Sequence, residues 1–174
     1  MFDFESRIID IPDYPKPGVV FKDITPLFSD PEALKATVDA IAEHFAGRGI
    51  TKVVGPEARG FMIGAPVAMA LGAGFVPARK PGKLPRETVS ATYELEYGTD
   101  ELHIHKDAIS SKDTVLIVDD LIATGGTVEA TGKLVRDMGA KLEGYACILE
   151  LAFLDPRERL ASDDAEFFSL VEVK

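Results

Sequence analysis

Thirteen consecutive residues near the middle of the chain, 115–127, combine residue types that could bind a sugar phosphate. Four apolar residues, Val115 to Val118, run directly into Asp119 and Asp120. The apolar run predicts a strand buried on both faces, as in the middle of a parallel sheet. Open α/β sheets bind ligands beyond the carboxyl ends of their strands. We therefore expect the two carboxylates to lie at a ligand site.

A loop of small residues follows the carboxylates and leads into a helical pattern. The loop consists of Ala123, Thr124, Gly125, Gly126 and Thr127. A helix N-terminus attracts phosphate through its unpaired N–H groups and the helix dipole. An ordinary strand-to-helix turn with an Asp cap would also contain such residues. The ordered context of the whole segment favours a ribose-phosphate site, although the segment carries neither a Walker Gly-Lys-Ser/Thr nor a Gly-x-Gly-x-x-Gly pattern.

A second candidate segment, Gly55-Pro-Glu-Ala-Arg-Gly-Phe61, follows a strand predicted at 50–54. The carboxyl ends of neighbouring parallel strands meet at one edge of the sheet, so this turn should lie beside Asp119. Arg59 could then hold a phosphate through two parallel hydrogen bonds. An isolated Arg in such a turn would simply be solvated, so the assignment depends on the neighbouring segment.

Four cations lie close together in an otherwise acidic chain: Arg79, Lys80, Lys83 and Arg86. Prolines and a glycine separate them, which predicts a loop. Most charge clusters form a solvated surface. The alternative is a mobile cationic loop that closes over a polyanion, and the phosphate site predicted elsewhere in the sequence favours this alternative.

Composition sets limits on the fold and the partners. The 174 residues are 46% hydrophobic and 28% charged, which fits one globular domain spanning 1–174. The net charge of -10 disfavours nucleic acid or an anionic membrane as the main partner. The single Cys147 rules out an intrachain disulfide framework and is expected to be a small core residue. We find no long apolar stretch near Met1 and expect a cytoplasmic protein.

Strand and helix patterns alternate along the chain, which predicts an α/β fold with a central, mostly parallel sheet flanked by helices. Asp30 is expected to cap a helix that ends near Gly47. Prolines predict an irregular segment over 8–28. Further strands are expected at 75–78, 115–118, 142–149 and 167–173, and helices at 61–71 and 128–138. Alternating residues from 89 to 104 predict a half-exposed hairpin with its turn at Gly98-Thr99-Asp100.

Two histidines of the predicted hairpin, His103 and His105, fall on one face of a strand. Such a pair could bind a metal, but no further ligand is near in sequence. A half-exposed strand face is the favoured interpretation.

Several segments together resemble one known family. The 115–127 segment is similar to the phosphoribosyl pyrophosphate (PRPP) motif of the type I phosphoribosyltransferases. The Arg59 turn resembles the pyrophosphate loop of adenine phosphoribosyltransferases. Residues 75–85 and 95–98 look like the two ends of their flexible loop, and 15–26 resembles their N-terminal hood. The similarity spans most of 10–151, so the chain is identified as a member of the adenine phosphoribosyltransferase family.

This resemblance implies a reaction of adenine with PRPP that gives AMP and pyrophosphate. Mg²⁺ would be held mainly by the substrate, with no direct protein ligands required. It also implies a hood over 1–30, a flexible hairpin lid over 79–106, and a homodimer. The peptide bond between Glu57 and Ala58 is expected to be cis.

The resemblance also assigns roles to individual residues. Asp119 and Asp120 would bind the ribose hydroxyls and favour a cationic sugar, and 123–127 would hold the 5′-phosphate. Glu96 would be an acid at adenine N7. The pyrophosphate would bind Glu57, Ala58, Arg59, Arg79, Lys80 and Lys83. Adenine would bind Val20, Phe21, Lys22 and Leu151. The residues expected to act in catalysis are Glu96, Asp119, Asp120 and Arg59.

Two alternatives remain open at this point. The first is a phosphoribosyltransferase for another base, such as xanthine, hypoxanthine or orotate, although the hood resemblance favours adenine. The second is a PRPP-sensing regulator without catalytic activity. Such regulators usually add a DNA-binding segment, and the acidic composition disfavours this alternative.

Overall fold

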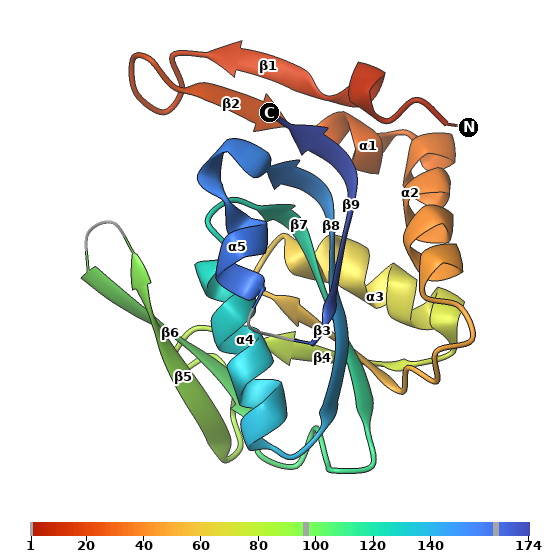
Figure 1. Ribbon diagram of the computed structural model, residues 1–174, viewed down its shortest axis with the longest axis vertical. Helices are drawn as coiled ribbons and strands as arrows, with labels where there is room; N and C mark the ends of the chain where they lie inside the picture. Colours follow the sequence, from red (N-terminus) through yellow and green to blue (C-terminus); the bar gives the residue numbers. More distant parts are fainter. Residues whose placement is uncertain (1, 96–97, 162–163) are drawn as a thin grey trace.

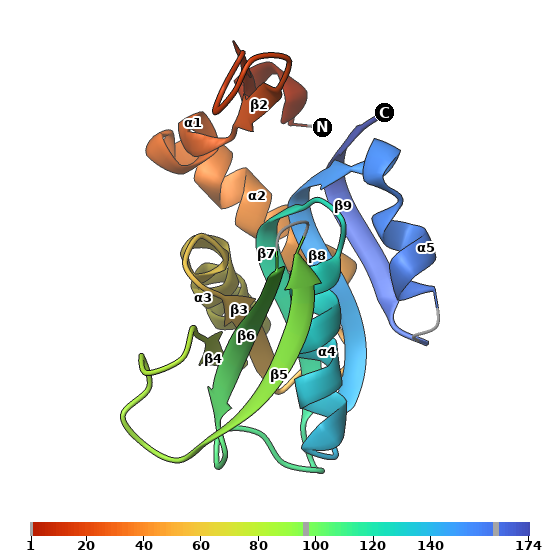
Figure 2. The same cartoon turned by 90° about the vertical axis from the view of Figure 1, so that its left-hand side faces the viewer.

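A five-stranded sheet forms the centre of the computed structural model, which describes residues 2–95, 98–161 and 164–174 (Figures 1 and 2). The strand order is β4 (Gly74–Ala78), β3 (Lys52–Pro56), β7 (Thr114–Ile122), β8 (Lys141–Leu151) and β9 (Glu166–Val173). All four pairings in this sheet are parallel. The predicted α/β fold with a parallel sheet is therefore confirmed.

Helices cover both faces of the sheet, and the alternation of strand residues decides which face each helix packs on. On one face, Val53 and Leu116 pack with α2 (Pro31–His44) and α3 (Gly60–Leu71). On the other face, Val54 and Ile117 pack with α4 (Gly126–Asp137). Because successive strand residues point to opposite faces, the apolar run at 115–118 supplies both cores. Cys147 is fully buried in the second core, as predicted.

The helices begin where the sequence predicted, within one or two residues. The Asp30 carboxylate accepts hydrogen bonds from the backbone N–H groups of Glu32 and Ala33, which caps α2. Helix α3 contains Pro66 and is apolar on all sides. The chain also forms short helices α1 (Thr25–Ser29) and α5 (Pro156–Leu160) and two 3₁₀ turns, η1 (Glu5–Arg7) and η2 (Ala152–Leu154).

A separate antiparallel hairpin, β5 (Thr88–Leu95) and β6 (Gly98–His105), packs its inner face on α4. The predicted turn at 98–100 is wrong, because Thr99 and Asp100 are paired strand residues opposite Glu94 and Tyr93. Their turn-like composition is overridden by the long strand pairing. Asp100 is also held in place by the Tyr93 hydroxyl, which donates to its carboxylate at 3.1 Å.

The proline-rich segment 8–28 is not irregular, and this expectation is also wrong. Strand β1 (Ile9–Pro12) pairs antiparallel with β2 (Val20–Asp23), and α1 follows. Most of the prolines fall in the connection or at strand and helix ends, where no ladder N–H is needed. The ribbon lies beyond the carboxyl ends of β8 and β9 (Figure 1).

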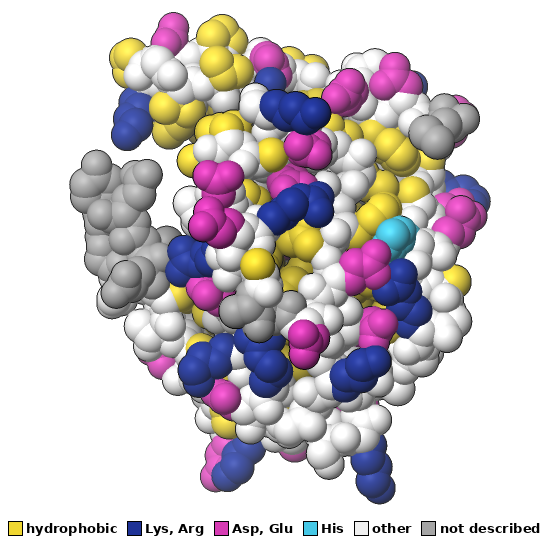
Figure 3. Space-filling view, in the orientation of Figure 1, with side chains coloured by type: hydrophobic (Ala, Val, Ile, Leu, Met, Phe, Trp, Pro, Cys, Tyr) yellow, Lys and Arg dark blue, Asp and Glu magenta, His cyan; other side chains and the backbone are white. Residues whose placement is uncertain are grey.

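The surface carries many charges of both signs. Lys and Arg side chains lie next to Asp and Glu on the face that contains α4 and α5 (Figure 3). Ion pairs on α4 and α5 include Lys133 with Asp137 and Arg159 with Glu129.

Within the described ranges, no helix has both the length and the apolar character that a membrane crossing would require.

Candidate functional site

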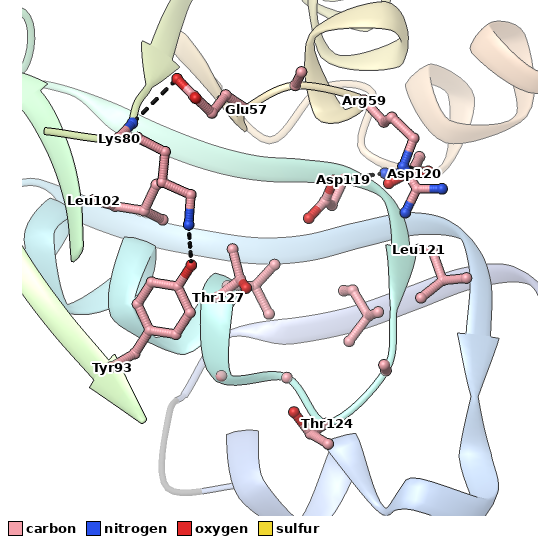
Figure 4. A pocket seen from close by; sticks show the side chains of 16 residues that line it. Glu57, Arg59, Lys80, Tyr93, Leu102, Asp119, Asp120, Leu121, Thr124 and Thr127 are labelled. Atoms are coloured by element: carbon pink, nitrogen blue, oxygen red, sulfur yellow. Dashed lines mark hydrogen bonds and ion pairs between the residues drawn. The ribbon is translucent and has the colours of Figure 1, made fainter. Parts of the chain in front are cut away.

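A pocket of about 330 Å³ brings together segments that are far apart in the sequence (Figure 4). The turn after β3, the start of the cationic loop, the hairpin, the end of β7 and the start of α4 all contribute to its walls. The lining residues are Glu57, Ala58, Arg59, Lys80, Tyr93, Leu102, Asp119, Asp120, Leu121, Ile122, Ala123, Thr124, Gly125, Gly126, Thr127 and Val128. The expected meeting of the Arg59 turn with the 115–127 segment is therefore confirmed.

Asp119 and Asp120 lie inside strand β7 rather than just beyond it. The sequence placed the end of this strand at Val118, but pairing with β8 continues to Ile122. The two carboxylates therefore alternate like other strand residues. Asp119 points toward the pocket, whereas Asp120 points toward Arg59 (Figure 4). Both side chains are buried, with residue exposures of 9% and 3%.

Burial dominates the electrostatics of this pair. It raises the pKa of Asp119 well above its ordinary value, and the charge of Asp120 raises it further. Burial also raises the pKa of Asp120, although the Arg59 guanidinium opposes the shift. Two adjacent buried carboxylates repel one another and favour a neighbouring positive charge. A cationic or metal-bound ligand in the pocket would relieve this repulsion.

The loop between β7 and α4 offers unpaired backbone donors to the pocket. Gly125 has a φ of 83°, a left-handed conformation that glycine adopts without steric cost, and α4 begins at the next residue. Among the described residues, no side chain caps this helix start. The first N–H groups of α4 are thus free to bind an anion such as a phosphate.

The turn after β3 places a cation against the carboxylates. The Glu57–Ala58 bond is cis, as expected. The Nε of Arg59 lies 3.0 Å from Oδ2 of Asp120, and about half of the Arg59 side chain remains exposed. Arg59 can therefore keep its contact with Asp120 while part of its guanidinium faces a ligand.

Of the four cations in the cationic loop, only Lys80 lines the pocket. Glu57 accepts hydrogen bonds from the Nε of Arg79 at 2.9 Å and from the backbone N–H of Lys80 at 3.1 Å. The ammonium of Lys80 contacts Asp100 and Tyr93 and lines the pocket. Arg79 and Lys83 do not line it. Arg86 lies further along the loop, where it pairs with Asp107.

The residues expected to bind a base lie outside this pocket. Phe21 packs edge-on against Tyr14 with ring centroids 5.3 Å apart, and the two rings line a separate hollow in the β1–β2 ribbon. Val20 is half exposed, and Lys22 donates to the Asp10 carboxylate at 2.7 Å. Leu151 is the last residue of β8 and is partly buried. Glu96 lies outside the described residues.

Five residues of the pocket wall were not predicted as site residues: Tyr93, Leu102, Leu121, Ile122 and Val128. Tyr93 and Leu102 point inward from the hairpin, and the alternation of apolar residues there could have placed them on the buried face. Nothing in the pattern indicates that this face would meet the end of β7.

In the same hairpin, His103 Nδ1 lies 2.9 Å from the Thr88 hydroxyl, and His105 Nδ1 lies 3.2 Å from Arg86 Nη2.

Known proteins share both the sequence and the fold. The model of the phosphoribosyl transferase domain family matches residues 25–174. An adenine phosphoribosyltransferase of Proteus mirabilis is 60% identical over 167 residues, which cover 96% of this chain and 91% of that protein.

Two solved structures extend the similarity to the backbone. An adenine phosphoribosyltransferase from Thermoanaerobacter pseudethanolicus is 49% identical, with a TM-score of 0.92 over 98% of both chains. The enzyme from Saccharomyces cerevisiae, solved with an imino-altritol bisphosphate and adenine, is 42% identical. Its TM-score is 0.90, over 97% of this chain and 96% of the yeast chain.

Proposed function

Because this chain belongs to the adenine phosphoribosyltransferase family, we propose that it transfers the 5-phosphoribosyl group of PRPP to N9 of adenine, giving AMP and pyrophosphate. The single observation that carries the proposal is one pocket that combines carboxylates, a helix N-terminus and cations. Two buried carboxylates, a helix start without a cap, and two cationic side chains surround one volume of about 330 Å³. Each group matches one part of PRPP.

The geometry supports one orientation of the substrate. The 5′-phosphate binds the backbone donors of 123–127 at the start of α4. The ribose hydroxyls face Asp119 and Asp120 at the end of β7. The pyrophosphate lies toward the turn 57–59 and Lys80, where the positive charges gather. Arg79 and Lys83 would join it if the cationic loop moves toward the pocket, as a closing lid over 79–106 requires.

The reaction breaks the bond from C1 to the pyrophosphate oxygen and forms a bond from C1 to adenine N9. Positive charge develops on the ribose and negative charge on the leaving group. The buried carboxylates stabilise the former, while Arg59 and Lys80 stabilise the latter. Water must be excluded, because a cationic sugar would be hydrolysed. This requirement supports a role for the hairpin and the β1–β2 ribbon as covers of the site.

Mg²⁺ would be held mainly by PRPP. Across the ranges that the structure describes, no three His, Cys, Asp or Glu side chains are grouped to bind a metal. Asp119 faces the pocket, whereas Oδ2 of Asp120 already lies 3.0 Å from Nε of Arg59, so Asp119 is the carboxylate beside which a bound cation would lie. When bound, the ion would neutralise charge on the leaving pyrophosphate.

Adenine would bind under the β1–β2 ribbon. Phe21 would stack on the base, the backbone of Val20 and Lys22 would contact its edge, and Leu151 would pack on the opposite face. The ribbon lies beyond the carboxyl ends of the strands, which supports this placement.

Glu96 would protonate N7 while N9 loses its proton. Glu96→Gln should then lower kcat more than it raises KM, and an effect confined to KM would remove this role.

The assembly and the location of the protein are part of the same proposal. A homodimer is supported by α3, which is apolar on all sides yet leaves Met62 and Met69 exposed at 43% and 83%. The proposed location is the cytoplasm. Light scattering in solution tests the dimer.

A panel of bases tests the function directly. The protein is incubated with PRPP, Mg²⁺ and adenine, hypoxanthine, xanthine or orotate, each separately. We expect AMP from adenine. Nucleotide from hypoxanthine but not from adenine would overturn the choice of base, and PRPP binding without turnover of any base would favour a sensing regulator. As a control for the site, the double variant Asp119→Asn, Asp120→Asn should lose turnover and PRPP affinity but keep its fold.

A further inference from the structure

Helix α5 lies against the outer side of the loop that is proposed to hold the 5′-phosphate. A Cβ atom on Gly125 would stand 3.6 Å from Pro156 Cβ and from Arg159 Cδ. A Cβ atom on Gly126 would stand 3.6 Å from the guanidinium carbon of Arg159. In Figure 1, α5 lies at the end of α4 where this loop enters the helix. Arg159 does not line the pocket, so it contacts the loop from behind.

Arg159 also forms an ion pair with a carboxylate at the start of α4. Its Nε donates to Oε2 of Glu129 at 2.6 Å. Glu129 lies in the first turn of the helix, where a negative charge stabilises the helix itself. The same charge repels a phosphate that binds the same helix end. Neutralising Glu129 therefore benefits phosphate binding.

A second arginine of α5 fixes the helix to the sheet. Arg157 donates from Nε and Nη2 to the two carboxylate oxygens of Glu150, at 2.7 and 2.6 Å. Glu150 is fully buried in β8 and also accepts from the Ser169 hydroxyl of β9 at 2.7 Å. Because an α-helix turns by roughly 100° per residue, Arg157 and Arg159 point in nearly opposite directions. Helix α5 thus bridges the sheet and the phosphate loop.

We propose that Arg159 is a positioning residue for the 5′-phosphate of the substrate. It packs behind Gly125 and Gly126, and it cancels the charge of Glu129 at the helix end that receives the phosphate. This inference rests on the proposed function. It adds that affinity for the 5′-phosphate is set partly by residues outside the pocket.

Binding of three ligands separates this role from a general structural one. AMP carries the 5′-phosphate, adenosine lacks it, and pyrophosphate is expected at a different part of the pocket. Titration calorimetry at low salt is performed on the full chain and on Arg159→Met, which keeps an apolar stem and removes the charge. We expect Arg159→Met to weaken AMP binding roughly three- to tenfold, with less effect at high salt. Adenosine and pyrophosphate affinities should stay unchanged.

Two further variants test the electrostatic origin of the effect. Glu129→Gln in the Arg159→Met background should restore AMP affinity, because no carboxylate remains to be neutralised. Arg159→Lys should keep most of the wild-type affinity. Equal AMP affinities of Arg159→Met with and without Glu129→Gln would overturn the inference, as would a parallel loss of pyrophosphate binding. If the unaltered chain neither binds AMP nor converts adenine, the proposed function fails as well. If it does both and Arg159→Met equals it, only this inference fails.

Discussion

Gly60, the first residue of α3, packs directly against the carboxylate of Asp119 in β7. A Cβ atom on Gly60 would stand 2.9 Å from Asp119 Oδ1 and 3.2 Å from the Val118 carbonyl oxygen. The absence of a side chain at this position therefore lets the Arg59 turn approach the end of β7. The contact ties the proposed pyrophosphate segment to the proposed ribose segment.

Gly60→Ala should impair turnover more than folding. The added methyl group must displace the Asp119 carboxylate, and a shift of about 1 Å in a reacting group can reduce the rate about 100-fold. Steady-state kinetics with adenine and PRPP measure the loss, and circular dichroism confirms the fold. Gly74→Ala is a matched control, because its Cβ would meet only the flexible side chain of Lys52, at 3.3 Å. Equal kinetics for both variants would contradict the proposed role of the contact.

Asp119→Asn should stabilise the protein while it removes activity. The pKa of Asp119 is raised by burial and by the charge of Asp120, so the folded state binds a proton more readily than the unfolded chain. The free energy of unfolding therefore falls as the pH rises from about 3.9, the ordinary Asp value, through the raised pKa. Asn carries no charge at any pH, so Asp119→Asn avoids this pH-dependent loss in the free energy of unfolding.

The stabilisation by Asp119→Asn should consequently depend on pH. We expect a gain near pH 7 that shrinks toward pH 4, measured by thermal unfolding across this range. Asp137→Asn, a change at an exposed position of α4, should alter the Tm little and serves as the control. A gain that stays constant from pH 4 to 8 would show that the charge is not its cause.

Removal of Arg157 should destabilise the chain through Glu150. The Glu150 carboxylate is fully buried, and in Arg157→Ala it would lose its bidentate partner. An uncompensated buried charge costs about 3 kcal/mol or more. Urea unfolding measures the cost. The double variant Arg157→Ala, Glu150→Gln should recover part of the stability, and failure to recover any would show that the loss comes from packing alone.

Gly132→Ala should strain the core between α4 and β8. Its Cβ would stand 2.3 Å from the Tyr145 hydroxyl oxygen and 3.1 Å from Leu142 Cδ2, and Tyr145 is fully buried. Overpacking of this kind costs about 1–3 kcal/mol. A thermal unfolding cycle with Tyr145→Phe should show positive coupling, because removing the hydroxyl relieves the closest clash. Strictly additive effects would contradict this account.

Most elements of the fold could be predicted from local patterns. The apolar run at 115–118 indicates a buried strand because both of its faces are apolar, and Asp30 before Pro31 indicates a helix start. The wrong expectations all concern how strands pair with one another. The end of β7, the hairpin register around Thr99 and the β1–β2 ribbon all depend on a partner strand, and local composition does not reveal that partner.

The same distinction applies to the candidate site. The residue types of the site could be recognised without a structure, because two adjacent carboxylates, a loop of small residues before a helix, and clustered cations each lie within a short segment. The folded chain was needed to show that Lys80 pairs with Asp100, that Arg59 faces Asp120, and that Arg159 lies behind the 123–127 loop. It also buried the two carboxylates. Such contacts join residues up to tens of positions apart, and they arise when the sheet and helices pack, which no local pattern encodes.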